Sequence, residues 1–144
     1  MNPCSFSSAG TARQTAAEWI RTAYHDMATH DVATGTGGLD ASILFETDRE
    51  ENVGDAFNGT FGFLSNYYNI RTSASDLLAL SVVVAAGHCG GQQIPLRAGR
   101  VDATEAGPLG VPKPDQDIET HTRIFAKAGF NTSEFSCSQN NNVD

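Results

Sequence analysis

The chain has 144 residues and a formal net charge of −8, from 9 basic and 17 acidic side chains. That length supports one domain with a moderate core, and a hydrophobic content of 40% is typical of a folded protein rather than a disordered one. Nucleic acids and anionic membrane surfaces attract clustered Lys and Arg, so the acidic balance argues against both as partners. No apolar run approaches the ~20 residues that a membrane-spanning helix needs.

The first predicted helix runs from residue 13 to about residue 28. Residues 1–12, rich in Ser, Ala and Gly, are expected to be irregular. Residues 29–38, rich in Gly and Thr, are expected to form a loop, and the segment LDASILFE after them has no clear secondary-structure preference. The helix prediction depends on apolar residues that recur at spacings of three and four: Ala16, Ala17, Ile20, Ala23, Tyr24 and Met27.

The middle of the chain contains the clearest predicted element, a buried helix over LLALSVVVAA. We expect Ser75 or Asp76 to cap it and Gly87 to end it. Residues 48–72 before it have a mixed pattern, and residues 91–114 after it, rich in Pro and Gly, are expected to form turns around a short extended piece. A last amphipathic helix is predicted over residues 117–128, so the predicted fold class is mainly α.

One face of the first predicted helix carries a chemically active pair. Arg21 and His25 lie four residues apart, so their side chains emerge together, and Tyr24 borders them. A neutral imidazole can take a proton from a bound substrate while a guanidinium stabilises a developing anion, and the heterolysis of hydrogen peroxide needs both. The alternative, that Arg21 points to solvent and His25 is a hydrogen-bonded core histidine, is not excluded by the pair alone.

The neighbouring residues offer hard oxygen ligands. Asp26 follows His25, and GGLDAS supplies Gly38, Asp40 and Ser42 after a loop. Two carboxylates, a hydroxyl and a glycine carbonyl are the kind of ligand set that calcium prefers. Although D-x-S alone is a common turn pattern, its coupling to the preceding histidine predicts a calcium site that ties the helix end to the loop.

Together, RTAYHD and GGLDAS resemble the distal half of the plant and fungal haem peroxidase superfamily, in particular its secreted fungal branch. Four later stretches are similar to the family's next landmarks in the same order: EENVG, DLLALSVVVAAGHCGG, IPLRAGRVDAT and FAKAGFNTSE. The resemblance covers roughly residues 3–135. It implies a helical distal domain over residues 1–130, followed by a polar tail, residues 131–144, in place of the proximal helix.

The resemblance implies a role for each matching residue. His25 would be the acid–base catalyst, Arg21 would stabilise the peroxide transition state, and Asn52 would accept the other imidazole N–H, which sets the tautomer. Tyr24, where the family usually has an aromatic residue without a hydroxyl, would line the haem b pocket with Arg21 and His25. The resemblance implies these calcium ligands: Asp26, Gly38 through its carbonyl, Asp40 and Ser42.

Two structural details also follow from the resemblance. Residues 94–96 are expected to form a strand near the haem edge, and Arg100 and Asp102 are expected to form a structural ion pair. The implied activity is the hydrogen-peroxide-dependent oxidation of a small organic reducing substrate, carried out by a monomer.

The family's proximal histidine, which binds the haem iron, has no match. Thr132, Ser133 and Glu134 look like a helix start, but FSCSQNNNVD follows and contains no histidine. We therefore expect a truncated peroxidase with impaired activity. The alternative is a non-catalytic calcium- or haem-binding remnant.

Three features bear on the compartment. The sequence begins without the pattern of a signal peptide, but Asn58 and Asn131 each begin an N-x-[ST] glycosylation pattern. Cys4, Cys89 and Cys137 leave one cysteine unpaired even if two form a bridge. Together these features predict an extracellular protein whose leader is missing.

Overall fold

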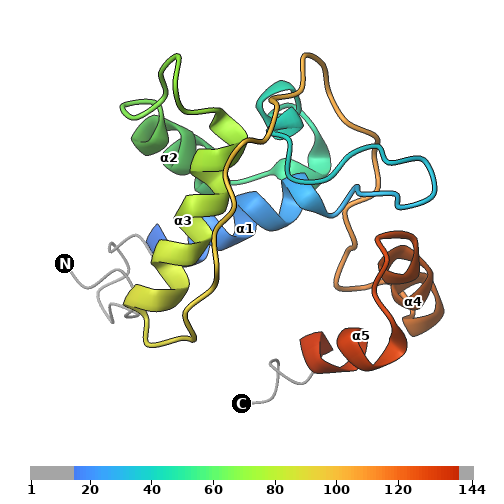
Figure 1. Ribbon diagram of the computed structural model, residues 1–144. Helices are drawn as coiled ribbons and strands as arrows, with labels where there is room; N and C mark the ends of the chain where they lie inside the picture. The colour runs from blue at the N-terminus through green and yellow to red at the C-terminus, as the bar shows by residue number, and fades with distance from the viewer. Residues whose placement is uncertain (1–14, 140–144) are drawn as a thin grey trace.

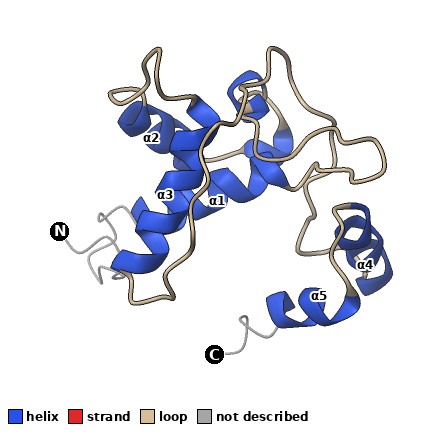
Figure 2. Cartoon of the chain, in the orientation of Figure 1, coloured by secondary structure: helices blue, strands red, loops and turns tan. Residues whose placement is uncertain are grey.

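The computed structural model describes residues 15–139, with side chains up to residue 135. In this part of the chain the protein is mainly helical and has isolated β-bridges but no strand (Figure 2), which confirms the predicted fold class. The expected irregular residues 1–12, the first two residues of the first predicted helix and residues 140–144 of the predicted tail lie outside the described residues.

The helical predictions hold with small shifts at the ends. The mixed segment before the central helix contains an α-helix that the sequence pattern did not reveal, and the ambiguous segment LDASILFE forms a short 3-10 helix. In chain order the described elements are α1 (Thr15–Met27), η1 (Ser42–Phe45), η2 (Glu50–Asn52), α2 (Asp55–Leu64), α3 (Ala74–His88), α4 (Ile118–Lys127) and α5 (Thr132–Gln139).

Helix α1 packs against α2 and α3 (Figure 1). Phe57 on α2 is the largest fully buried side chain, and burying an aromatic ring of this kind contributes about 1.5–3 kcal/mol to folding. The Thr22 and Thr60 hydroxyl oxygens, both buried, lie 3.0 Å apart and join α1 to α2. The central core cluster comprises Ala41, Ile43, Phe57, Leu64, Leu77 and Leu78.

The N-terminus of α3 differs from the prediction in its cap. Ser73 is the capping residue, and its Oγ accepts a hydrogen bond from the Asp76 N–H at 3.1 Å. The predicted caps, Ser75 and Asp76, lie inside the helix, because the helix begins one turn earlier than the apolar run that marked it. The C-terminal end, at His88, is one residue beyond the predicted stop.

The predicted ion pair between Arg100 and Asp102 is wrong. Arg100 binds the carboxylate of Asp76 at 3.0 Å, whereas the carboxylate of Asp102 accepts hydrogen bonds from the backbone N–H groups of Ala74 and Ser75. The first N–H groups of a helix have no partner within it and attract a carboxylate, so Asp102 binds the start of α3. The strand predicted over residues 94–96 is also wrong, since these described residues belong to no strand.

Helices α4 and α5 pack against each other and stand beside the three-helix group (Figure 1). Their contact is aromatic, with the ring centroid of Phe125 at 5.7 Å from that of Phe130 and 5.0 Å from that of Phe135. Helix α4 is attached to the loop after α1, because the Val32 N–H donates to the Lys127 carbonyl at 3.1 Å. The predicted helix start at Thr132 is confirmed.

Candidate active site

Arg21 and His25 emerge on the same side of α1. The Arg21 guanidinium lies 5.1 Å from the centroid of the Phe57 ring, and the His25 ring lies 5.2 Å from the same centroid, edge to face. Both contacts come from the helical spacing of four residues, which directs the two side chains toward α2. The prediction that the pair shares one face is confirmed.

A chain of hydrogen bonds orients His25. Its Nδ1 lies 2.9 Å from Oδ1 of Asn52, and the Asn52 side-chain amide donates to the carbonyl of Glu46 at 3.0 Å. Since that amide group is already used as a donor, its oxygen faces the imidazole and Nδ1 carries the proton. Asn52 is only 3% exposed, so the arrangement is protected from water.

The electrostatic surroundings keep His25 neutral at pH 7. Burial lowers the pKa of His25 below its ordinary value of 6.5, and the positive charge of Arg21 also lowers it. The hydrogen bond that His25 donates to Asn52 and the negative charge of Glu51 oppose this shift without cancelling it. The second ring nitrogen, Nε2, has no hydrogen-bond partner among the described residues, so it is free to act as a base.

The side chain of Arg21 is exposed, but two contacts fix its position. One terminal nitrogen donates to the carbonyl of Val53 at 3.0 Å, and the guanidinium lies over Phe57. Gly54 is next to this contact with φ +119°, a conformation that favours glycine, and a Cβ there would sit 3.4 Å from the guanidinium. The η2–α2 connection therefore fixes where the positive charge lies.

Tyr24 lines an apolar cavity of about 270 Å³ between α1 and the α4–α5 pair. Met27 at the end of α1 and Ala28 after it line the cavity together with Phe125 on α4 and Pro112. Burial raises the pKa of Tyr24, so its phenol stays protonated at neutral pH. The ring also contacts His25, with centroids 5.9 Å apart.

These residues fit a large, planar, mainly apolar cofactor. Apolar side chains beside the pair are exposed on the same helix and on the connection to α2, with Ile20 43% and Val53 67% exposed. The fixed guanidinium of Arg21 donates to the Val53 carbonyl, and the His25 ring contacts the ring of Tyr24, which lines the cavity. These side chains therefore suit haem on the side of α1 that carries Arg21 and His25.

Three of the four predicted calcium ligands, Asp26, Asp40 and Ser42, lie close together. Asp26 is 1% exposed, and its carboxylate accepts the Ala41 and Ile43 N–H groups at 2.8 and 3.0 Å. The Ser42 hydroxyl lies 3.5 Å from Oδ1 of Asp26, and the Ser42 N–H donates to Asp40 at 3.0 Å. Gly38, with φ +103°, lies two residues before Asp40, and its carbonyl accepts the Asp40 N–H.

The charge on Asp26 suits a bound cation. Burial raises the pKa of Asp26 to about 6, and the negative charge of Asp40 raises it as well. No basic side chain pairs with Asp26 within the described residues, although a buried carboxylate is costly without a compensating charge. The same residues contain no group of three or more His, Cys, Asp and Glu side chains able to hold a metal, so a calcium ion would also need the uncharged oxygens of Gly38 and Ser42.

The prediction from sequence missed the residues that support the site. The carbonyls of Glu46 and Val53 hold Asn52 and Arg21, but a backbone acceptor leaves no pattern in side-chain identity. Glu46 and Arg49 are spaced for a local ion pair, and that spacing was the one available signal.

The comparisons with known proteins give the family. A family model described as peroxidase matches residues 5–137. A WSC domain-containing protein of Arthroderma benhamiae is 47% identical over 93% of this chain and 19% of its own length. The peroxisomal L-ascorbate peroxidase 5 of Arabidopsis thaliana is 33% identical over 83% of this chain and 44% of its own length. The mitochondrial cytochrome c peroxidase of Cryptococcus neoformans is 33% identical over 80% of this chain and 32% of its own length.

The chain spans less than half the length of these relatives. Their names include peroxisomal and mitochondrial proteins, so the predicted placement in the secreted fungal branch is not tested by them. In the described part of the chain, no helix has both the length and the apolar character needed to cross a membrane. The family match over nearly all of the sequence and the helical fold agree, and the chain belongs to the peroxidase family, the haem peroxidases of plants and fungi.

Proposed function

We propose that this chain forms the peroxide-binding side of a haem peroxidase, with His25 as the acid–base catalyst and Arg21 as the stabilising cation. The observation that carries the proposal is the state of the imidazole. Its Nδ1 is bound to Asn52 at 2.9 Å, while its Nε2 is unbonded on the side that carries Arg21. A general base needs a free nitrogen of this kind and a pKa below the working pH.

The residues act on hydrogen peroxide in two steps. Nε2 of His25 takes the proton from one peroxide oxygen and then delivers it to the other. As the O–O bond breaks, negative charge develops on this second oxygen, which the Arg21 guanidinium stabilises until the oxygen leaves as water. When bound, haem would supply the two electrons for this reduction, and a small organic donor would restore these electrons together with the protons that convert the first oxygen to water.

Tyr24 contributes to the cofactor pocket in this proposal. Its ring covers the cavity between α1 and α4, and its protonated phenol adds a hydrogen-bond donor beside the bound haem b. The acidic balance of the chain, with a net charge of −8, supports an enzyme for small molecules rather than a nucleic-acid-binding protein. We propose that it acts as a monomer, as the family resemblance implies.

We also propose that residues 1–130 form the distal domain, that residues 131–144 form a polar tail in place of the proximal helix, and that this chain by itself has impaired activity. No histidine of the described residues supplies an iron ligand opposite His25. His30 binds the Thr36 carbonyl, His121 binds the Lys113 carbonyl, and His88 is exposed at the end of α3. Haem bound by the described residues alone would lack the histidine through which the family holds the iron.

Addition of haem to the purified chain tests this function and its limit. We expect haem to bind on the side of α1 that carries Arg21 and to give a haem absorption band. We also expect slow oxidation of guaiacol by hydrogen peroxide. A stable five-coordinate spectrum with brisk turnover would contradict the proposal of impaired activity. Failure to perturb the haem spectrum at all would contradict the proposed pocket. The His88→Ala variant, changed at an exposed histidine on α3, should behave as the parent chain.

A second candidate, a calcium-binding module without catalysis, is favoured by one observation. The buried carboxylate of Asp26 lies close to the half-buried carboxylate of Asp40, and neither has a basic partner among the described residues. We propose that Asp26, Gly38, Asp40 and Ser42 bind calcium through oxygen atoms. In either function the ion would hold the end of α1 on the loop, next to His25.

We further propose that the protein resides in an extracellular, oxidising compartment. Cys89 is disulfide-bonded, and disulfides persist mainly in secreted proteins. Both other cysteines, Cys4 and Cys137, have side chains outside the described residues. Mass spectrometry of the protein from its native host, with and without reduction, should show one bridge that includes Cys89. A fully reduced Cys89 in that preparation would contradict the proposal.

A further inference from the structure

Glu46, which directly follows η1, carries a deeply buried carboxylate. It is 2% exposed, and its Oε1 accepts the N–H of Gly107 at 2.7 Å. Its Oε2 lies 3.0 Å from the guanidinium of Arg49, three residues later. The carboxylate therefore joins the segment before η2 to a loop some sixty residues further along the chain.

Arg49 completes this link from the other side. Its guanidinium donates to the carbonyl of Gly107 at 2.6 Å and to that of Pro108 at 3.4 Å, besides its pairing with Glu46. We call these four residues, Glu46, Arg49, Gly107 and Pro108, the Arg49 clamp. A Cβ on Gly107 would lie 3.0 Å from Oε1 of Glu46 and 2.9 Å from the Ser42 hydroxyl, so the approach depends on glycine.

The backbones of Glu46 and Arg49 also hold Asn52. The carbonyl of Arg49 accepts the Asn52 N–H at 2.9 Å, and the carbonyl of Glu46 accepts the Asn52 side-chain amide at 3.0 Å. The position of Asn52 is thus determined by the two residues whose side chains are fixed by the loop at Gly107. Asn52 in turn holds Nδ1 of His25 at 2.9 Å.

We propose that Arg49 is a positioning residue, which sets the tautomer of His25 through Asn52 by fixing η2 on the loop at residues 107–108. This inference deepens the proposed function, because the tautomer decides whether Nε2 can take a proton. A guanidinium is suited to this task, since its fork of donors reaches the Glu46 carboxylate and two carbonyls at once, with Oε1 of Glu51 3.9 Å away. An ammonium group at the same place keeps the charge but cannot make all three contacts.

The test uses the whole chain without haem, labelled with ¹⁵N at histidine, at about pH 8. Two-bond ¹H–¹⁵N correlations report which ring nitrogen of His25 carries the proton. We expect the Nδ1–H tautomer to dominate in the parent chain. In Arg49→Gln and in Arg49→Lys the ratio of the Nδ1–H to the Nε2–H tautomer should fall about fivefold, the factor that a hydrogen bond of ordinary net strength supports. Calcium is kept at one concentration throughout.

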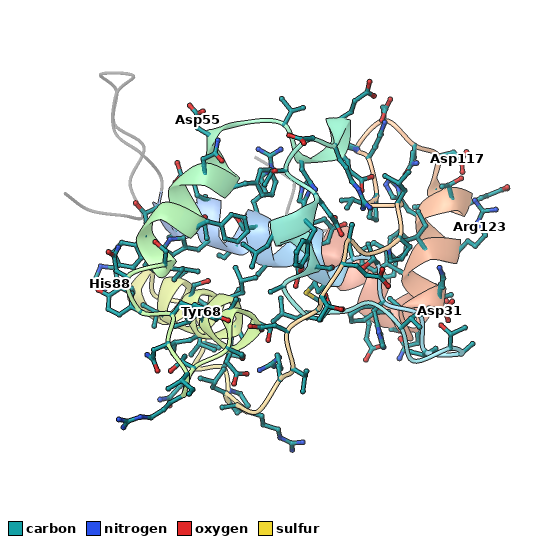
Figure 3. All side chains as sticks on the ribbon, turned by 90° about the horizontal axis from the view of Figure 1, so that it is seen from above. Asp31, Asp55, Tyr68, His88, Asp117 and Arg123 are labelled. Atoms are coloured by element: carbon teal, nitrogen blue, oxygen red, sulfur yellow. The ribbon has the colours of Figure 1, made fainter. Side chains whose placement is uncertain are left out.

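Two further variants make the result specific. Arg123→Gln removes a guanidinium that points outward from α4 (Figure 3) and should leave the tautomer ratio unchanged. Gly107→Ala disturbs the clamp without changing a charge and should shift the ratio in the same direction as Arg49→Lys. If Arg49→Gln fails to fold, Arg49→Lys and Gly107→Ala still decide the question, and circular dichroism shows that these variants retain their helices.

A parent-like tautomer ratio in folded Arg49→Lys and Gly107→Ala would overturn the proposal. A shift in Arg49→Gln alone would also overturn it, because that result indicates an effect of charge rather than of position. The measurement needs neither haem nor peroxide. A chain without peroxidase activity would therefore leave this result intact, and the failure of the proposed function can be distinguished from the failure of the clamp.

Discussion

Replacement of His25 by alanine in the haem-loaded protein is expected to slow its reaction with hydrogen peroxide by about 10²–10⁴-fold, the usual contribution of a positioned acid–base group. The imidazole is the group at the Arg21 side of α1 that can both accept and return a proton near neutral pH. Alanine leaves the helix intact, because it has the highest helix propensity. Stopped-flow absorbance at pH 7 under excess peroxide measures the rate.

The pH dependence of the same rate gives a second readout. The base must be neutral, and burial lowers the pKa of His25 below 6.5. The rate of the parent protein should therefore fall to half its plateau value only at a pH below 6.5, whereas His25→Ala should lack this decline. His88→Ala serves as the matched control, with an unchanged rate at every pH. A loss of less than tenfold in His25→Ala would count against the proposed role.

Asp26 is expected to make the stability of the calcium-free protein depend strongly on pH. Its pKa is raised to about 6 in the folded chain from an ordinary value of 3.8, mainly by burial. The folded state thus binds more protons than the unfolded state between these two values. The stabilising contribution is complete below the unfolded pKa and is lost as the pH rises through 6, by on the order of 3 kcal/mol in total.

Urea unfolding between pH 4 and pH 8, with a chelator and then with excess calcium, measures this effect. Calcium binds the ionised carboxylate, so it should restore stability at pH 7.5 and have little effect at pH 4. Asp26→Asn should remove both the pH dependence and the response to calcium. An exposed carboxylate, Asp115, offers the matched control as Asp115→Asn. A calcium response that survives in Asp26→Asn would contradict the proposed site.

Several elements of the fold could be predicted because they depend on local patterns. The three-and-four spacing of apolar residues marked α1, and the amphipathic pattern over residues 117–128 marked α4. Helix α2 was missed, because its segment mixes glycine and polar residues with aromatic ones and shows no clean period. Its helical state depends on the burial of Phe57 and Leu64 against neighbouring elements, which is a property of the packed chain.

The candidate site shows the same division. The spacing of Arg21 and His25 determined their common face, since four residues make about one helical turn. The partner of Arg100 was misjudged, because it depends on where residues 99–102 return to the start of α3. Hydrogen bonds between segments far apart in the sequence leave no periodic trace in it.

By itself, the sequence determined the helical class, the peroxidase resemblance and the types of side chain available for acid–base chemistry and calcium binding. Only the tertiary structure decided which groups meet: the bond between Asn52 and His25, the burial of Asp26 without a basic partner among the described residues, and the Arg49 clamp. The physical reason is range. Helix formation follows from neighbours within one or two turns, whereas the tautomer, the charge state and the position of a catalytic group follow from contacts that close long loops.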